Sequence, residues 1–174
     1  GMSFTALGAN GALLAGQGGV MRLDGSFEPI AGKRIPYISI GAGKLEQSGS
    51  SRAAQFMLLE QAFNEAKAPT AGDERLLTSQ GRQALTQEMA SSRFFVSVNR
   101  EADIRQVLKF AQKYNVRIAL VGASEAWRVA DQLASAKVPV FIDATEALPS
   151  SMEQIGTTQE NAARLQRAGV SISF

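Results

Sequence analysis

The chain has 174 residues, of which 45% are apolar and 20% charged, proportions typical of a soluble globular domain of ordinary size. It contains no histidine and no cysteine, which excludes disulfides, thiol nucleophiles, Ser-His-Asp triads and the usual zinc sites. Its 18 basic residues exceed its 16 acidic ones only slightly and are scattered along the sequence, so nucleic-acid binding is not favoured.

The sequence shows no apolar run near the roughly 20 residues of a membrane span. Its first residues lack the basic-then-apolar layout of a signal peptide. A soluble protein that does not insert in membranes is therefore predicted. The composition leaves its compartment open, because a chain without cysteine folds in reducing and oxidising surroundings alike.

Residues 1–50 are predicted to form an irregular region that contains β-structure. Glycine recurs over residues 8–19, but neither a P-loop nor a dinucleotide fingerprint follows, which favours tight turns over a phosphate-binding loop. Short strands are expected near residues 3–7, 19–23 and 37–40, the last of them from its alternation and its β-branched residues.

Residues 51–90 are predicted to form a pair of helices. A serine at 50 or 51 can cap the first helix, in which apolar residues recur at helical spacing to about residue 66. A stretch with proline and glycine then breaks the helix, and Asp73 is expected to cap the second one.

Residues 94–174 alternate apolar strands with helices. Strands are predicted at 94–98, 117–121, 138–142 and 170–174, and helices at 101–114, at 124–136 and from a capping box at 157–160 to Gly169. This alternation indicates right-handed βαβ crossovers and a parallel sheet. The whole chain is therefore predicted to be a single α/β domain.

Sites in parallel α/β folds form at the carboxyl ends of strands. The candidate ligand-binding residues at those ends are Ser97, Asn99, Arg100, Gly122, Ser124 and Asp143, with Glu146 close behind. Arg100 could grip a carboxylate or phosphate, and the glycine turn could place an anion at a helix N-terminus. The two carboxylates could perform acid–base chemistry or hold a hard cation.

Each candidate also has a purely structural role open to it. Asn99 can cap the following helix while Arg100 pairs with a neighbouring acid. Ser124 can cap the next helix after a tight turn, and the acidic residues at 143 and 146 can lie in a solvated loop. Two carboxylates alone supply fewer oxygens than a hard metal ion needs.

Four stretches carry a resemblance to a known family: FVSVNREADI (95–104), VRIALVGASEAW (116–127), ADQLASAKVPV (130–140) and NAARLQRAGV (161–170). With GQGGVMRLDG (16–25) and the Ser51-Arg52 helix start, they resemble the metal-dependent amidohydrolases, in the imidazolonepropionase-like branch. The resemblance implies a TIM-type (β/α)8 barrel beside a small β-sandwich. It also implies a divalent metal such as zinc that activates water against linear or cyclic amides.

The resemblance places this chain in the middle of the barrel, as an incomplete barrel domain. Where the family carries metal-binding histidines at two strand ends, this sequence has Ser97 and either Val121 or Gly122. It therefore implies a chain without metal ligands, cofactor or catalytic residues, inactive on its own. The alternatives are a non-catalytic ligand-binding or oligomerising module, and a hydrolase completed by a partner chain. Exposed sheet edges predict a homo-oligomer.

Overall fold

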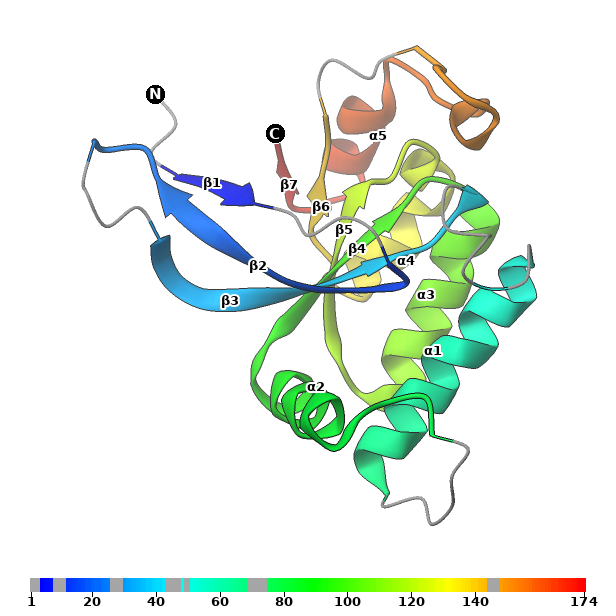
Figure 1. Cartoon of the computed structure of the whole chain (residues 1–174). Coiled ribbons are helices and arrows are strands. Elements are labelled where there is room, and N and C mark those ends of the chain that lie inside the picture. Colours follow the sequence, from blue (N-terminus) through cyan, green and yellow to red (C-terminus); the bar gives the residue numbers. More distant parts are fainter. Residues whose placement is uncertain are drawn as a thin grey trace.

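The computed structural model describes residues 4–7, 12–25, 30–42, 48, 51–68, 75–143 and 148–174 (Figure 1). Its strands are β1 (Phe4–Leu7), β2 (Leu14–Arg22), β3 (Ile30–Ser39), β4 (Arg93–Val98), β5 (Arg117–Gly122), β6 (Val140–Phe141) and β7 (Ile172–Ser173). Its helices are α1 (Arg52–Lys67), α2 (Ser79–Ser91), α3 (Glu101–Tyr114), α4 (Ala130–Ser135) and α5 (Asn161–Arg167), with the 3₁₀ turns η2 (Ala126–Val129) and η3 (Met152–Gln154).

The described strands form one seven-stranded sheet whose spatial order follows the chain, from β1 to β7. The neighbours β1, β2 and β3 are antiparallel, whereas every pair from β3 to β7 is parallel. The predicted parallel α/β arrangement is therefore confirmed, and it extends back to β3. β6 and β7 are shorter than predicted, and β7 forms one edge of the sheet.

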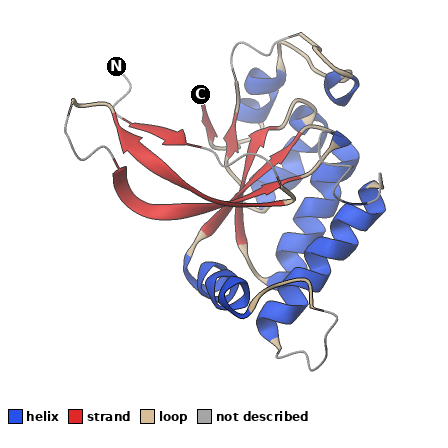
Figure 2. Cartoon of the chain, viewed as in Figure 1, coloured by secondary structure: helices blue, strands red, loops and turns tan. Residues whose placement is uncertain are grey.

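The helices α1, α3, α4 and α5 lie on the same side of the parallel strands, while α2 lies near the start of β4 (Figure 2). Doubly wound sheets carry helices on both faces and reverse their strand order, which this sheet does not do. Successive βα units of a barrel share the consecutive order and the single helical face seen here. None of the helices in the described part of the chain could cross a bilayer.

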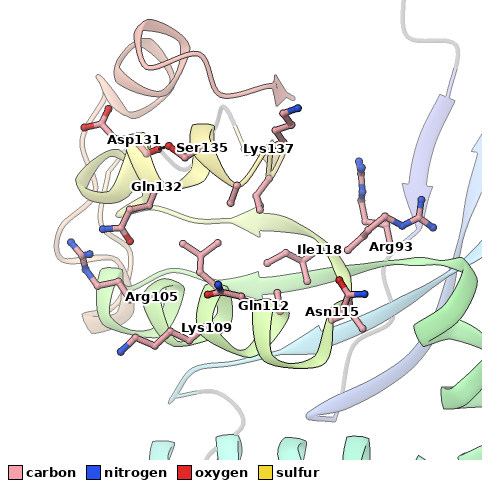
Figure 3. Close-up of a pocket in the computed structure, with 16 residues that line it drawn as sticks. Arg93, Arg105, Lys109, Gln112, Asn115, Ile118, Asp131, Gln132, Ser135 and Lys137 are labelled. Atoms are coloured by element: carbon pink, nitrogen blue, oxygen red, sulfur yellow. Dashed lines mark hydrogen bonds between the residues drawn. The ribbon is translucent and has the colours of Figure 1, made fainter. Parts of the chain in front are cut away.

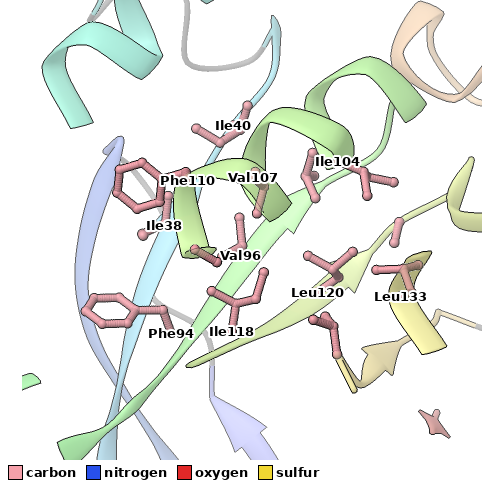
Figure 4. Packing of buried hydrophobic residues seen from close by; sticks show 14 of the residues in the cluster. Ile38, Ile40, Phe94, Val96, Ile104, Val107, Phe110, Ile118, Leu120 and Leu133 are labelled. Carbon is pink, nitrogen blue, oxygen red and sulfur yellow. The ribbon is translucent and has the colours of Figure 1, made fainter. Parts of the chain in front are cut away.

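The main core fills the space between the helices and the sheet (Figure 4). Ile38, Val96 and Leu120 stand in register on β3, β4 and β5 and point to this side, as the two-residue period of a strand requires. Ile104 and Val107 face them from α3, which has the predicted bounds 101–114. Burial of both apolar faces fixes the position of the helix over the strands.

The opposite face of the sheet carries a second apolar cluster. Tyr37, Phe95 and Ala119 stand there in register and are buried. The ring centroid of Phe95 lies 5.4 Å from that of Tyr37 and 4.8 Å from that of the half-buried Phe141. No helix in the described residues covers the parallel strands on this side (Figure 2).

The second helix starts later than the sequence predicts. α2 begins at Ser79, and Asp73, its expected cap, lies outside the described residues. The buried carboxylate of Glu65 accepts hydrogen bonds from the backbone amides of Leu76 and Leu77, each at 2.9 Å. These amides lower the pKa of Glu65, and they hold the segment before α2 in a bent, non-helical conformation.

The predicted helix at 124–136 is also shorter, because it begins as the 3₁₀ turn η2 before α4. Ser124 is not its cap, since its hydroxyl donates to Asn99 Oδ1 at 2.9 Å. Asn99 in turn does not cap α3, where Arg100 is the N-cap and makes no side-chain cap bond. The two polar side chains bond to each other instead of to helix ends.

The capping box predicted at 157–160 does not form. α5 begins at Asn161, and the Glu160 carboxylate pairs with Arg164 at 2.8 Å instead of turning back to cap the helix. Gly169 does end this helix as predicted, with φ +84°. A glycine meets no steric penalty in that left-handed conformation.

Candidate functional site

A small pocket of about 140 Å³ opens at the carboxyl ends of β5 and β6, beside the start of α5. Three of the predicted site residues, Gly122, Ser124 and Asp143, line it together. Four polar residues from a later segment of the chain also line it: Thr157, Thr158, Gln159 and Asn161. The rule that sites form at strand ends therefore locates a concave region with converging polar groups.

Asn99 supports this pocket from the end of β4. Its Oδ1 atom accepts hydrogen bonds from Ser124 Oγ at 2.9 Å and from the Ser124 amide at 3.4 Å. The backbone carbonyl oxygen of Asn99 accepts a third hydrogen bond, from the Glu125 backbone amide at 3.0 Å. Asn99 thus joins the ends of β4 and β5, which explains why it is not free to cap α3.

The turn after β5 has an unusual backbone. Gly122 has φ +81° and Ala123 has φ +49°, so two successive residues are left-handed. A Cβ atom at Gly122 would lie only 2.9 Å from Asn99 Oδ1. An L-residue in this conformation costs about 1–2 kcal/mol, so Ala123 is strained. Such strain persists only where the surrounding contacts hold the backbone in place.

The buried side chain of Asn161 supplies much of that restraint. Its Nδ2 donates to the carbonyl of Ala123 at 3.1 Å, and its Oδ1 accepts from the Trp127 amide at 3.0 Å. Asn161 therefore fastens the start of α5 to the strained turn. Sequence reasoning missed it because the predicted capping box assigned this region to helix initiation alone.

Glu125 binds the N-terminal end of α3, which is the capping role that the sequence assigned to Asn99. Its Oε2 accepts a hydrogen bond from the Glu101 amide at 2.8 Å, at the N-terminal end of α3. A carboxylate is favourable at that end of a helix, where unpaired amides concentrate positive charge. Gly156 makes room for it, since a Cβ there would lie 2.3 Å from Glu125 Oε1.

Thr157 differs from the other pocket residues. Its Oγ1 atom is buried and has no hydrogen-bond partner among the described residues. A buried hydroxyl without a partner costs about 1–3 kcal/mol, and the large majority of buried side-chain polar atoms are paired. This hydroxyl can donate one hydrogen bond and accept others, and its residue is part of the pocket wall.

The remaining candidates lie outside the pocket. Ser97 is half-buried on β4, on the same sheet face as Phe95, and Arg100 is exposed before α3. The two acids nearest to Arg100 along α3 pair with Arg105 and Arg52 instead of with Arg100. Glu146 lies outside the described residues.

The donors at the strand ends do not fit a catalytic metal. Among the described residues, no group of three or more histidine, cysteine, aspartate or glutamate side chains lies together. The histidine positions implied by the family resemblance hold Ser97 and Val121 or Gly122, and Asp143 is the one carboxylate among the described residues that line the pocket. Hydroxyls, an amide and a single carboxylate make a poor zinc site.

Replacing Gly122 with alanine is expected to lower the free energy of unfolding by about 2–3 kcal/mol, because strain from φ adds to a clash with Asn99. Gly169→Ala is the matched control, since it shares the positive φ but nothing lies within 4 Å of its Cβ position. Urea denaturation measures both variants. Equal losses would show that contact with Asn99 contributes nothing.

No family model matches this sequence, and no curated protein matches it. Among solved structures, the chain is similar to the crystal structure of an amidohydrolase from Thermotoga maritima MSB8, with 20% sequence identity and a TM-score of 0.83. The match covers 99% of this chain and 50% of that one. The chain therefore spans about half the length of that protein and shares the fold of the matched half.

Proposed function

We propose that this chain is an amidohydrolase-like module, built as part of a barrel, that binds a small amide-bearing ligand and does not perform metal-dependent hydrolysis. The observation that carries the proposal is the buried hydroxyl of Thr157, which has no partner among the described residues and belongs to a residue that lines the strand-end pocket. The fold shared with the Thermotoga maritima amidohydrolase supports the class of protein. The consecutive strand order supports the partial barrel.

The chemistry of the pocket suits a neutral amide. The Thr157 hydroxyl can donate to an amide C=O, and the Ser124 hydroxyl, which donates its own proton to Asn99, can accept from an amide N–H. The resemblance to the imidazolonepropionase-like branch points the same way, toward a linear or cyclic amide. A volume of about 140 Å³ limits the ligand to a few heavy atoms.

The proposed loss of hydrolysis rests on the side chains at the strand ends. An amidohydrolase mechanism needs a metal to generate hydroxide from water at neutral pH. Ser97 and either Val121 or Gly122 stand where the resemblance expects the imidazoles that hold this metal. None of these residues can replace an imidazole, so we expect binding without turnover.

Titration calorimetry with hydantoin, 2-pyrrolidinone and acetamide tests the binding. Thr157→Val is expected to weaken it about three- to tenfold, the value of one hydrogen bond, and to leave the free energy of unfolding equal or slightly higher. Thr86→Val is the control, because this threonine lies on α2 and bonds to Ala66 and Arg82 backbone carbonyls. Unchanged binding in Thr157→Val would reject the ligand contact.

Metal analysis and a hydrolysis assay with the same amides test the second half of the proposal. The expected result is substoichiometric zinc after dialysis against zinc, and no turnover above background. Stoichiometric zinc together with hydrolysis of any of the three amides would reject the inactive assignment and leave the amide-binding assignment in place.

We also propose that the chain forms homo-oligomers through its uncovered sheet face and its β7 edge. Phe141 is half-buried on that face, and Phe174, which follows β7 and lines the strand-end pocket, is 70% exposed. Exposed strand edges and apolar patches favour association. Multi-angle light scattering over a dilution series is expected to give at least twice the 18.5 kDa mass of the chain. A strictly monomeric profile would reject this assembly.

A further inference from the structure

A second concave region lies at the other end of the sheet, between α3 and α4. This groove of about 880 Å³ is lined by both helices and by the first residues of β4 and β5 (Figure 3). The two helices meet η2 near their N-terminal ends, and the groove opens toward their C-terminal ends. Its larger apolar residues are the partly buried Leu108 and, at its base, the buried core residues Val116, Ile118 and Val138.

Cations surround this apolar floor. Arg93, Arg105, Lys109, Arg117 and Lys137 all line the groove, against the single carboxylate of Asp131. They are far apart in sequence, so their scatter along the chain concealed the patch that folding creates. Figure 3 shows the side chains from α3 toward one end of the groove and Arg93 and Lys137 toward the other, with Ile118 between them.

Three of these cations are available to a partner. Arg105 is held by Glu101 at 2.8 Å, and Arg117 donates to the Ser91 carbonyl at 2.7 Å. The other three cations form no ion pair or hydrogen bond with a described residue, and all three are exposed: Arg93, Lys109 and Lys137. No described residue of the fold therefore neutralises their charges.

Lys137 occupies a backbone position that favours glycine. It follows α4 with φ +52°, and the Val138 amide bonds back to the Leu133 carbonyl at 3.0 Å. The same return bond ends α5, where Gly169 takes the left-handed position. A lysine in this left-handed conformation is strained, and glycine would be favoured there. The chain nevertheless has a lysine at this position, and that lysine lines the groove.

We propose that this groove binds an acidic amphipathic helix of a partner protein. The apolar stripe of such a helix would pack on the partly exposed Leu108, over the buried base of the groove, while its flanking carboxylates would meet the cations at both ends. Charge complementarity selects an acidic partner, because four of the five lining cations form no ion pair with a described residue and only one carboxylate lines the groove beside them. The bound helix would lie in the outer layer, beside α3 and α4.

The lining chemistry disfavours a nucleic acid in this groove. Single-stranded nucleic acids bind through bases stacked on aromatic rings, and no described residue that lines the groove is aromatic. The net charge of the whole chain is only +2, which gives little long-range attraction for a polyanion. An apolar floor between two groups of cations matches an amphipathic surface better than a uniform phosphate backbone.

Fluorescence anisotropy on the full chain tests the proposal with a labelled synthetic helix of about 14 residues, with leucines at i, i+3, i+4 and i+7 spacing and glutamates elsewhere. We expect saturable binding that Lys109→Glu with Lys137→Glu weakens about tenfold or more. Lys137→Gly is expected to weaken binding severalfold while keeping or raising the Tm, because glycine relieves the strain.

The control variant, Arg22→Glu with Arg167→Glu, has the same change in net charge at exposed residues away from the groove. It is expected to bind the probe like the wild-type chain. Failure of the probe to bind, or an equal loss in the control variant, would overturn the proposal. So would equal binding of a scrambled peptide of the same composition, or tighter binding of a single-stranded oligonucleotide through the same lysines.

Discussion

Replacing Phe63 with alanine is expected to lower the free energy of unfolding by about 3–5 kcal/mol, enough to lower the Tm by about 10 °C. Phe63 lies on α1 and is completely buried. Its ring centroid lies 4.8 Å from that of Phe110, 5.3 Å from that of Tyr114 and 5.5 Å from that of Phe94. Removing it leaves a cavity where α1, α3 and β4 meet.

Met57→Ala is the matched control for this loss, because it lies on the same helix and its side chain is 71% exposed. Its effect is expected to stay within about 0.5 kcal/mol. Thermal unfolding followed by circular dichroism compares the two variants. A similar fall in Tm for both would show that α1 is held by its backbone geometry and not by this aromatic cluster.

Removing the Arg52 side chain is expected to cost about 3 kcal/mol, because it leaves a buried acid without its partner. Arg52, at the start of α1, pairs with Asp103 on α3 and with Glu153 on η3. Burial lowers the pKa of Arg52, but its bonds to the two carboxylates outweigh that effect and raise it. Arg52→Ala measured by urea denaturation at neutral pH gives the loss.

The loss should depend on pH. Burial raises the pKa of Asp103 and Arg52 opposes this rise, so Arg52→Ala should raise that pKa further. Since the folded state then holds the proton more tightly than the unfolded state, the defect is full above the folded pKa. It shrinks as the pH falls from that pKa to the pKa of Asp103 in the wild-type fold, which burial also holds above the usual value of an aspartate.

Two further variants isolate this effect. Asp103→Asn in the Arg52→Ala background is expected to recover much of the loss and to reduce its pH dependence, because the more deeply buried of the two partner carboxylates is gone and only Glu153 remains. Lys113→Ala breaks the exposed pair with Glu60, with side chains 55% and 42% exposed, and should cost no more than about 1 kcal/mol. Equal losses in the free energy of unfolding for Arg52→Ala and Lys113→Ala would contradict the claim that a buried ion pair costs more to break than an exposed one.

The sequence predicts the parallel half of this fold well because its signals are local. The bounds of α3 follow from apolar residues at helical spacing, and the end of α5 follows from Gly169. The start of α2 could not be predicted, because it depends on a carboxylate of α1, Glu65, that binds amides after the intervening loop. That contact has no local pattern.

In the candidate site, too, residues with a local sequence signal could be predicted, whereas residues brought in by distant contacts could not. Strand-end position alone identifies Gly122, Ser124 and Asp143 as neighbours. It could not identify Asn161 or Thr157, because both reach the pocket from a segment whose local pattern indicates only a helix cap. The unpaired hydroxyl of Thr157 is a property of packing, which no sequence pattern encodes.

The chain-ordered sheet also sets the sequence in which its parts can assemble. Each strand after β4 finds its neighbour one crossover earlier in the chain, so these pairings close short loops. β4 must instead find β3 across a connection that holds both α1 and α2. The entropy of closing that connection is the largest in the parallel sheet, so we expect the pairing of β3 with β4 to form later than the pairings of the strands that follow.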